Sequence, residues 1–352
     1  MKPFSICMIA KNEEKNIARC LDSVSHFDCE IIIVDTGSTD RTKEIASQYT
    51  SKIYDFAWVD DFSAARNFSL SKASYDWVLV LDCDEWVEDA NPEEFMELAR
   101  TYPAYIGRLK RKNLTVSDSE KGVYIDPVER FFSRRYFHYE GTIHEQVMPL
   151  TAQTPMLFDI PLTVLHSGYV GSAEDAEAKR IRNTSLLERE LAKNPDDPYL
   201  LFQMGQEYYC MDDRKTAAEY YAKVLSFDLS PTLEYLRLTI QAYGNCLISL
   251  GKIDEALQFE HIYNEFSRNP DFVFLMGRIY FSAGQYLKAM GEFIKATTMD
   301  NAYSEGTNTY LAWYYIALIY EKMGDLASAK TFYTKCGDFE PALKRLNIIS
   351  NQ

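Results

Sequence analysis

The first half of the chain alternates short apolar runs with segments of helical period. The apolar runs are typical of buried strands, and the segments between them repeat apolar side chains at the spacing of an amphipathic helix. This alternation predicts βαβ units on a largely parallel sheet. The predicted strands cover residues 4–10, 29–35, 53–56 and 77–81, the predicted helices cover residues 14–24, 39–47 and 63–73, and longer aromatic-rich strands follow at 105–112 and 124–134.

From about residue 194 the pattern becomes helical and repeats itself. Small residues recur with spacings of 39, 33 and 40 residues at Gly205, Gly244, Gly277 and Ala317. Each of them has an alanine twelve positions later: Ala217, Ala256, Ala289 and Ala329. This pattern resembles the tetratricopeptide repeat, in which small residues let paired helices approach each other. The fourth unit matches best, with Trp313, Tyr320, Tyr333 and Pro341 at the expected offsets.

The two patterns predict an α/β domain over residues 1–172, with a Rossmann-like and mostly parallel sheet, and an all-α repeat domain over residues 173–352. A length of 352 residues agrees with two domains. The chain carries 37 basic and 52 acidic residues, a net charge of -15. Such a charge repels nucleic acid and anionic membranes, so we expect no nucleic-acid partner.

Cysteine usage and hydropathy indicate a cytoplasmic protein. The seven cysteines are scattered and include no Cys-x-x-Cys pair, as expected for reduced thiols. The apolar start of the chain reads as a first strand and not as a signal peptide. No run approaches the roughly 20 apolar residues that span a bilayer, so we expect no integral membrane segment.

Polar side chains follow the predicted strands where those strands end. Asp82-Cys83-Asp84 comes directly after an apolar run, Asn12 and Glu13 follow the first strand, and Asp35 ends the second. The carboxyl ends of parallel strands meet at one edge of a sheet, where open α/β folds bind ligands. Paired carboxylates there suit a divalent cation and a phosphate. Alone, the triplet is a weak signal, because Asp-x-Asp also occurs in solvated loops and at helix N-termini.

Two predicted helix starts contribute further polar residues to this edge of the sheet. Gly37-Ser38 permits a tight turn into a helix capped by Ser38 or Thr39. Ser63 is the predicted cap of the next helix and places Arg66 near its N-terminus, where an arginine can meet a diphosphate. The alternatives are an ordinary N-cap for Ser38 and a surface ion pair for Arg66.

This ordered set resembles the inverting family 2 glycosyltransferases with a GT-A fold, closely over residues 4–90 and more loosely over residues 130–170. The resemblance implies that Asp82 and Asp84 address the ribose and a metal that bridges the diphosphate, with Asp84 as the more direct ligand. It implies a Mg or Mn cation and a UDP-sugar donor. The residues that it places around the donor are Ala10, Asn12, Glu13, Asp35, Ser38, Arg66, Asp82, Cys83 and Asp84.

The same resemblance suggests the catalytic base and the last metal ligand. Glu145 is the expected base, and His166 is the expected third ligand beside Asp84 and Asp82, with His144 as the competing candidate. The Glu-Asp base motif that is familiar in the family is absent from this chain. A lone histidine is as often structural as functional.

The overall plan is similar to the peptide S-glycosyltransferases of the sublancin type. The shared segments are residues 61–67, His144-Glu145 and His166-x-Gly168-Tyr169. This similarity implies transfer of a hexose or N-acetylhexosamine to a Cys or Ser side chain of a peptide or protein, with the repeats binding the acceptor or forming a homodimer. The alternatives are a glycosyltransferase of surface polysaccharide or glycolipid synthesis and a non-catalytic repeat scaffold.

Overall fold

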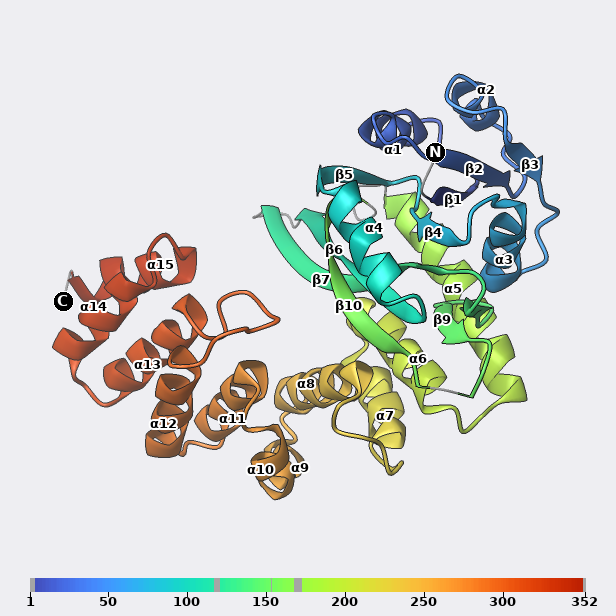
Figure 1. Ribbon diagram of the computed structural model, residues 1–352. Helices are drawn as coiled ribbons and strands as arrows, with labels where there is room; N and C mark the ends of the chain where they lie inside the picture. Colours follow the sequence, from blue (N-terminus) through green and yellow to red (C-terminus); the bar gives the residue numbers. More distant parts are fainter. Residues whose placement is uncertain (1–3, 117–120, 153, 168–172, 351–352) are drawn as a thin grey trace. The chain divides into compact units, whose positions relative to one another are not determined.

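The computed structural model describes residues 4–116, 121–152, 154–167 and 173–350, drawn as a ribbon in Figure 1. The chain divides into two compact units, Met1–Leu186 and Leu187–Gln352. The first is an α/β unit, and the described part of the second holds only helices. The division falls within helix α5 (Ala173–Lys193), whose first residue is where the sequence predicts the second domain to begin.

The first unit is built on strands, six of which match the predicted ones and four of which the sequence did not predict. They are β1 (Ser5–Ala10), β2 (Glu30–Asp35), β3 (Ile53–Asp55), β4 (Trp77–Val80), β5 (Glu85–Ala90), β6 (Tyr105–Val116), β7 (Lys121–Ser133), β8 (Phe137–Glu140), β9 (Gln146–Pro149) and β10 (Met156–His166). Eight of them form one sheet in the order β3-β2-β1-β4-β7-β6-β10-β5, and β8 pairs with β9. The four neighbouring strands β3, β2, β1 and β4 run parallel to one another, and β6 and β10 are also parallel. The other pairs in the sheet are antiparallel, so the sheet is mixed but mainly parallel.

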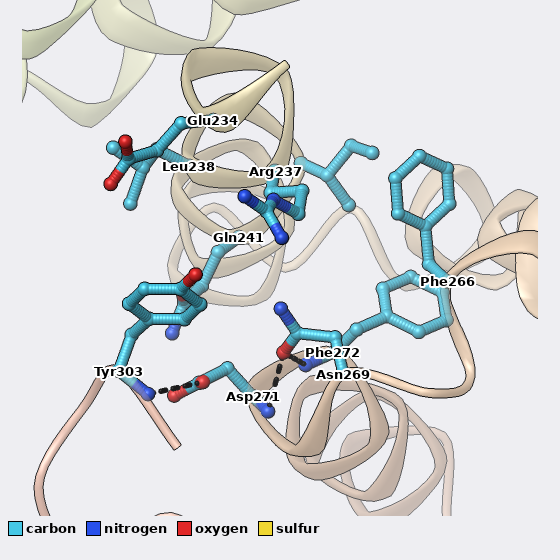
Figure 2. A pocket seen from close by; sticks show the side chains of 10 residues that line it. Glu234, Arg237, Leu238, Gln241, Phe266, Asn269, Asp271, Phe272 and Tyr303 are labelled. Atoms are coloured by element: carbon cyan, nitrogen blue, oxygen red, sulfur yellow. Dashed lines mark hydrogen bonds between the residues drawn. The ribbon is translucent and has the colours of Figure 1, made fainter. Parts of the chain in front are cut away.

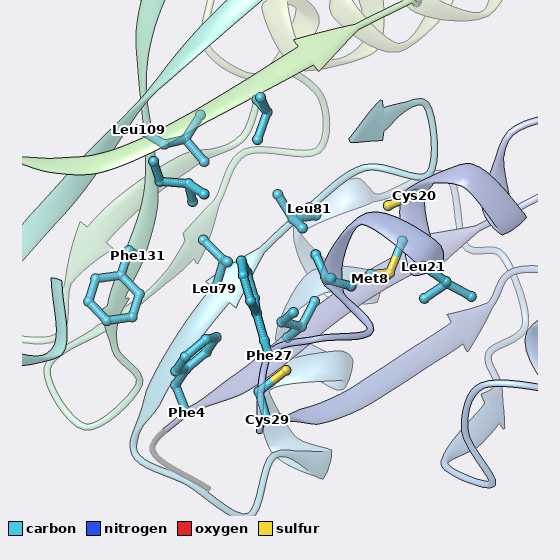
Figure 3. Close-up of a cluster of buried hydrophobic side chains, with 14 of the residues drawn as sticks. Phe4, Met8, Cys20, Leu21, Phe27, Cys29, Leu79, Leu81, Leu109 and Phe131 are labelled. Atoms are coloured by element: carbon cyan, nitrogen blue, oxygen red, sulfur yellow. The ribbon is translucent and has the colours of Figure 1, made fainter. Parts of the chain in front are cut away.

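The sheet is covered on both faces because its central strands are apolar on both sides. The covering helices are α1 (Ile17–Val24), α2 (Thr42–Ala46), α3 (Phe62–Lys72) and α4 (Pro92–Thr101). In β1, Met8 packs on the face that carries α1 and α4, whereas Cys7 packs on the face of α3. Figure 3 shows Met8, Leu79 and Leu21 in the first of these layers. This arrangement confirms the predicted α/β class.

Two predicted helix caps are wrong. Helix α3 takes Asp61 as its N-cap, and the Asp61 side chain accepts a hydrogen bond from the Ala64 amide. Ser63 instead lies inside the first turn. Helix α2 begins only at Thr42, so neither Ser38 nor Thr39 caps it. A carboxylate accepts hydrogen bonds from amides at a helix start as well as a hydroxyl does, and the sequence offered both.

The second unit pairs antiparallel helices in succession along the chain (Figure 1). Its helices are α6 (Pro198–Cys210), α7 (Arg214–Val224), α8 (Glu234–Ser249), α9 (Ile253–Leu257), the 3₁₀ helix η1 (Gln258–Ile262), α10 (Tyr263–Phe266), α11 (Pro270–Ser282), α12 (Tyr286–Thr297), α13 (Tyr310–Lys322), α14 (Leu326–Lys335) and α15 (Glu340–Ser350).

Small residues set the distance between the paired helices. A Cβ atom added to Gly205 would lie 2.5 Å from the Tyr221 ring, and one added to Gly277 would lie 2.6 Å from the Phe293 ring. Glycine therefore lets a large aromatic side chain of the second helix lie against the backbone of the first. The four alanines of the repeating pattern are fully buried, which agrees with the predicted tetratricopeptide-like plan: Ala217, Ala256, Ala289 and Ala329.

Candidate active site

The loops that follow β1 and β2 are linked by a hydrogen bond between Asn12 and Ser38. Ala10 and Asp35 end the two strands in register. Asn12 then takes a φ of 57°, its amide donates to Ser38 Oγ at 2.9 Å, and its Oδ1 accepts from the Thr39 amide at 2.8 Å. Four of the residues that were predicted to surround the sugar donor thus lie at one edge of the sheet: Ala10, Asn12, Asp35 and Ser38. Asn12 and Ser38 shape the two loops there.

Asp35 has one carboxylate oxygen engaged and one without a partner. The side chain is 2% exposed. Its Oδ1 accepts hydrogen bonds from the Gly37 amide at 3.0 Å and the Ser38 amide at 2.9 Å. Its Oδ2 is buried and has no hydrogen-bond partner. Because a buried unsatisfied acceptor costs about 1–3 kcal/mol, this atom is suited to a donor group of a ligand.

Asp82 is held by two arginines. Its Oδ1 lies 2.8 Å from Arg66 Nη2, and its Oδ2 lies 2.7 Å from Arg130 Nη2. Burial raises the pKa of Asp82, but the attraction of Arg130 and Arg66 outweighs it and holds that pKa well below its usual range. Asp82 is therefore a carboxylate anion, and both of its oxygens face guanidinium groups.

Arg66 connects Asp82 with the predicted base. It is 6% exposed, and its Nε forms an ion pair with Glu145 Oε1. The guanidinium centre also lies 5.5 Å from the Tyr139 ring centroid. Its Nη1 is buried and has no hydrogen-bond partner. The structure brings Arg66, Asp82 and Glu145 together, and it fixes the Glu145 carboxylate through Arg66.

Asp84 faces His166 across the end of β10. Asp84 Oδ2 lies 3.3 Å from His166 Nε2. His166 Nδ1 lies 2.7 Å from Asn113 Oδ1, and Asn113 Nδ2 donates to Asp126 Oδ1 at 2.8 Å. Because the Asn113 oxygen is an acceptor, Nδ1 carries a proton, and Nε2 is the ring nitrogen that faces Asp84. A histidine oriented in this way by a second group is typical of metal ligands.

These two side chains fit a divalent cation. A carboxylate oxygen and an imidazole nitrogen form a donor set that suits Mn better than Mg. Within the described ranges, no three His, Cys, Asp or Glu side chains form a ligand group, so Asp82 is not assembled into one. His144 lies in the β8–β9 loop with a φ of 51°. Gly168 and Tyr169 of the predicted motif lie outside the described residues.

The remaining predicted residues lie close to this edge. Burial raises the pKa of Glu13, and the negative charges of Asp84 and Asp82 add to the effect. Cys83 is 3% exposed, belongs to the core, and directs its thiol to the Ile9 carbonyl at 3.5 Å. Glu13 therefore adds a carboxyl group near the Asp82–Asp84 loop, whereas the Cys83 side chain faces inward.

Comparison with known proteins relates the first domain to a known family. Residues 5–149 match the model of glycosyl transferase family 2. The first domain belongs to that family. Residues 310–342 match a tetratricopeptide repeat model, which is the unit that fits the repeating pattern best. The family 2 domain and the repeats confirm the resemblance drawn from the sequence.

Related proteins match this chain over part of its length. A TPR repeat-containing protein of Synechococcus elongatus is 33% identical over 58% of this chain and 52% of its own length. The SPbeta prophage-derived glycosyltransferase SunS of Bacillus subtilis is 29% identical over 62% of this chain and 52% of its own. An uncharacterized glycosyltransferase of Rickettsia prowazekii is 38% identical over 41% of this chain and 51% of its own. The chain thus spans about half the length of these relatives.

The family 2 domain contains site residues that the sequence did not single out. Arg130 comes from β7 and Asn113 from β6, and they hold Asp82 and His166 respectively. Glu85, which is fully buried, accepts a hydrogen bond from the Asp82 amide at 3.0 Å. A charged residue directly before the apolar pair Phe131-Phe132 was the available signal for Arg130.

In the described part of the chain no helix is long and apolar enough to cross a membrane.

Proposed function

We propose that this chain is a metal-dependent, inverting glycosyltransferase that moves a hexose or N-acetylhexosamine from a UDP-sugar to a side chain of a peptide or protein. The observation that carries the proposal is the Asp84–His166 pair at 3.3 Å, at the ligand-binding edge of a family 2 domain. Two potential metal ligands from distant parts of the chain meet there. The relatives that carry the name glycosyltransferase support the same activity.

The nucleotide is proposed to lie over the ends of β1 and β2. The unpartnered Asp35 Oδ2 is an acceptor for an N–H or O–H of the nucleoside. Asn12 and Ser38 keep the flanking loops in place through their mutual hydrogen bond at 2.9 Å. Because Asp35 is buried and its other oxygen is fixed by two amides, it offers a rigid contact that selects for a donor group.

The diphosphate is proposed to lie between Arg66 and the Asp84–His166 pair. Asp84 and His166 would hold a Mn or Mg cation. Such a cation would neutralise the negative charge that develops on the departing diphosphate. Arg66 contributes the donor Nη1, which has no hydrogen-bond partner within the protein. Asp82 keeps Arg66 and Arg130 in position and balances their charge.

Glu145 is the proposed base for the acceptor. Its carboxylate is fixed by the Arg66 ion pair, close to the Asp82–Asp84 loop that Arg66 also contacts. A positioned carboxylate that removes the acceptor proton contributes typically about 10²- to 10⁴-fold to the rate. Attack from the side opposite the leaving diphosphate would invert the anomeric carbon.

The acceptor is proposed to be a polypeptide because the chain carries an array of paired helices after the transferase domain. Helical repeats present extended surfaces that suit peptides and partner helices. To test this, the full chain is incubated with Mn²⁺, a mixture of UDP-glucose, UDP-galactose and UDP-N-acetylglucosamine, and synthetic peptides that carry a single Cys or Ser. Mass spectrometry should detect one added hexose or N-acetylhexosamine.

Matched peptides with Ala at the acceptor position serve as controls and should stay unmodified. The variant His166→Gln should reduce the yield and change the relative activity with Mn²⁺ and Mg²⁺, because it replaces the proposed nitrogen ligand. Turnover of UDP-sugar with transfer only to a lipid or polysaccharide acceptor would contradict the peptide assignment. It would favour the alternative of surface glycan synthesis.

A further inference from the structure

A pocket lies in the helical unit, far along the chain from the proposed transferase site. It is formed by α8, by the start of α11 and by the loop between α12 and α13 (Figure 2). It is a small pocket, with a cavity volume of about 20 Å³, and it is partly open to solvent. All of its lining residues belong to the second unit. The pocket can therefore be described without reference to the first unit.

The loop that forms one wall is held in place by Asp271. This side chain is 3% exposed. It accepts hydrogen bonds from the Tyr303 amide at 2.8 Å, the Ser304 amide at 2.9 Å and the Thr307 hydroxyl at 3.0 Å. Gln241 of α8 also donates to Ser304 Oγ at 3.1 Å. The wall that carries Tyr303 is thus preorganised, which lowers the entropic cost of binding a ligand.

Arg237 supplies an unpaired positive charge to the pocket. Its Nε is buried and has no hydrogen-bond partner, and no carboxylate of the described residues forms an ion pair with it. Its guanidinium carbon lies 5.5 Å from the Tyr303 ring centroid. In Figure 2 the guanidinium points into the space between α8 and Asn269, while the Glu234 carboxylate points away from it. A buried donor without an acceptor is costly, so a ligand acceptor would stabilise it.

Asn269 adds a second donor on the same side. Its Oδ1 is committed to the N-cap of α11, because it accepts from the Asp271 amide at 2.8 Å and the Phe272 amide at 3.2 Å. The amide nitrogen is consequently turned to the other side, toward Arg237 (Figure 2). A guanidinium and a carboxamide N–H₂ facing one space form a donor pair that matches the two oxygens of a carboxylate.

The rest of the pocket wall is apolar. Phe266 and Phe272 are 7% and 5% exposed, and Ile240 of α8 belongs to the same apolar cluster; Leu238 also lines the pocket. An apolar group beside the anion would bury surface against these side chains. The carboxylates of Glu234 and Asp271, which also line the pocket, repel additional negative charge. The surroundings therefore favour one acid next to an apolar residue over a run of acids.

We propose that this pocket binds a polypeptide segment through a single Asp or Glu side chain that pairs with Arg237, with a neighbouring apolar side chain against Phe266 and Phe272. Only the statement that this polypeptide is the sugar acceptor rests on the function proposed above. Binding itself requires no metal and no sugar donor. The pocket then selects the acceptor by a carboxylate that is not itself modified.

The test uses the full chain, fluorescently labelled, on an array of immobilised hexapeptides. Each peptide carries Phe or Leu followed by Asp, Glu, Asn, Gln or Lys in an otherwise Gly-Ser background. We expect Asp and Glu peptides to bind about tenfold more tightly than their Asn and Gln counterparts, as a charge-assisted pair predicts. Arg237→Gln should abolish this preference, whereas Arg268→Gln, which removes an exposed arginine outside the pocket lining, should preserve it.

A second variant covers the case in which Arg237→Gln disturbs α8. Tyr303→Ala removes a side chain that is 41% exposed and leaves the backbone contact with Asp271 in place, and it should weaken binding of the acidic peptides several-fold. Asp84→Asn, which alters only the transferase domain, should bind as the unmodified chain does. The inference is overturned if the unmodified chain shows no preference for acids, or if neither pocket variant alters it.

Discussion

At the scale of single residues, Asp82 and Asp84 have different surroundings although only Cys83 separates them. Both oxygens of Asp82 face arginines, at 2.8 Å and 2.7 Å. Asp84 instead faces His166 Nε2 at 3.3 Å and is paired with no arginine or lysine in the described chain. Asp82 is therefore a structural anion that organises the site, whereas Asp84 is available to a cation. This division of roles leads to opposite expectations for the two asparagine variants.

Asp82→Asn should destabilise the first unit by about 3 kcal/mol, because it leaves Arg66 and Arg130 buried without their shared counter-charge. Asp84→Asn should change the free energy of unfolding by less than about 1 kcal/mol, since it removes no strong ion pair. Urea denaturation followed by tryptophan fluorescence measures both. Equal stability of the two variants would show that Asp82 does not compensate the arginines.

Glu30 makes the stability of the first unit depend on pH. Burial raises its pKa, but hydrogen bonds from Lys52, Ser5 and Ser74 outweigh burial and lower the pKa to about 2 from an ordinary value of 4.5. A lowered pKa means that its contribution is complete above about pH 4.5 and is lost as the pH falls toward 2. The difference corresponds to about 3 kcal/mol.

Glu30→Gln should therefore lower the free energy of unfolding by about 3 kcal/mol at neutral pH. It should also flatten the acid limb of the stability curve between about pH 4.5 and 2. Denaturant titrations across this pH range test the prediction. Parallel curves for the variant and the unmodified chain would show that another carboxyl group controls acid unfolding.

At the scale of elements, the sequence predicts the βαβ part well and the later part poorly. Strands β1, β2 and β4 are built on continuous apolar runs, so the sequence pattern alone locates them. Strand β5 reads Glu-Trp-Val-Glu-Asp-Ala, and its polar residues hide it. Helix α4 carried signals that were overlooked: Asn91 caps it, Pro92 occupies its first turn, and Glu94 stands at the third position.

The helix pairs of the second unit provide a direct test of the role of glycine. Gly277→Ala would place a Cβ 2.6 Å from the Phe293 ring, so we expect a loss of about 1–3 kcal/mol. Gly291→Ala is a matched control in α12, where nothing lies within 4 Å of the new Cβ. It should stabilise the helix by about 0.5–1 kcal/mol. Thermal denaturation compares them, and a shift of the same sign in both variants would argue against close packing at Gly277.

At the scale of the whole molecule, the candidate site depends on contacts between residues far apart in the sequence. The strand-end carboxylates Asp35, Asp82 and Asp84 were predictable because parallel strands bring their carboxyl ends together. Arg130 and Asn113 were not, because their positions follow from the order β4-β7-β6-β10, which no local pattern specifies. The approach of His166 to Asp84 depends on the same strand order. The family resemblance predicted a histidine beside Asp84, but it did not predict that Asn113 orients this histidine.

The proposed peptide pocket would give the repeat unit a binding surface with its own chemistry. The chain as a whole is acidic, with a net charge of -15, yet the pocket in the second unit presents Arg237 without an acidic partner. A separate surface for the polypeptide would let the transferase domain accept one side chain of a segment while the repeats hold another. This division explains how one acceptor residue could be chosen among chemically identical ones.

The most direct test of the central claim is the Mn²⁺-dependent release of UDP from UDP-sugars by the full chain. Asp84→Asn should reduce turnover on the order of 100-fold, because loss of the cation removes several kcal/mol of charge stabilisation. Asp89→Asn, at an exposed position of the adjacent strand β5, is the matched control and should retain full activity. Turnover that is unchanged in Asp84→Asn, or that needs no divalent cation, would contradict the assignment of this edge as the metal and diphosphate site.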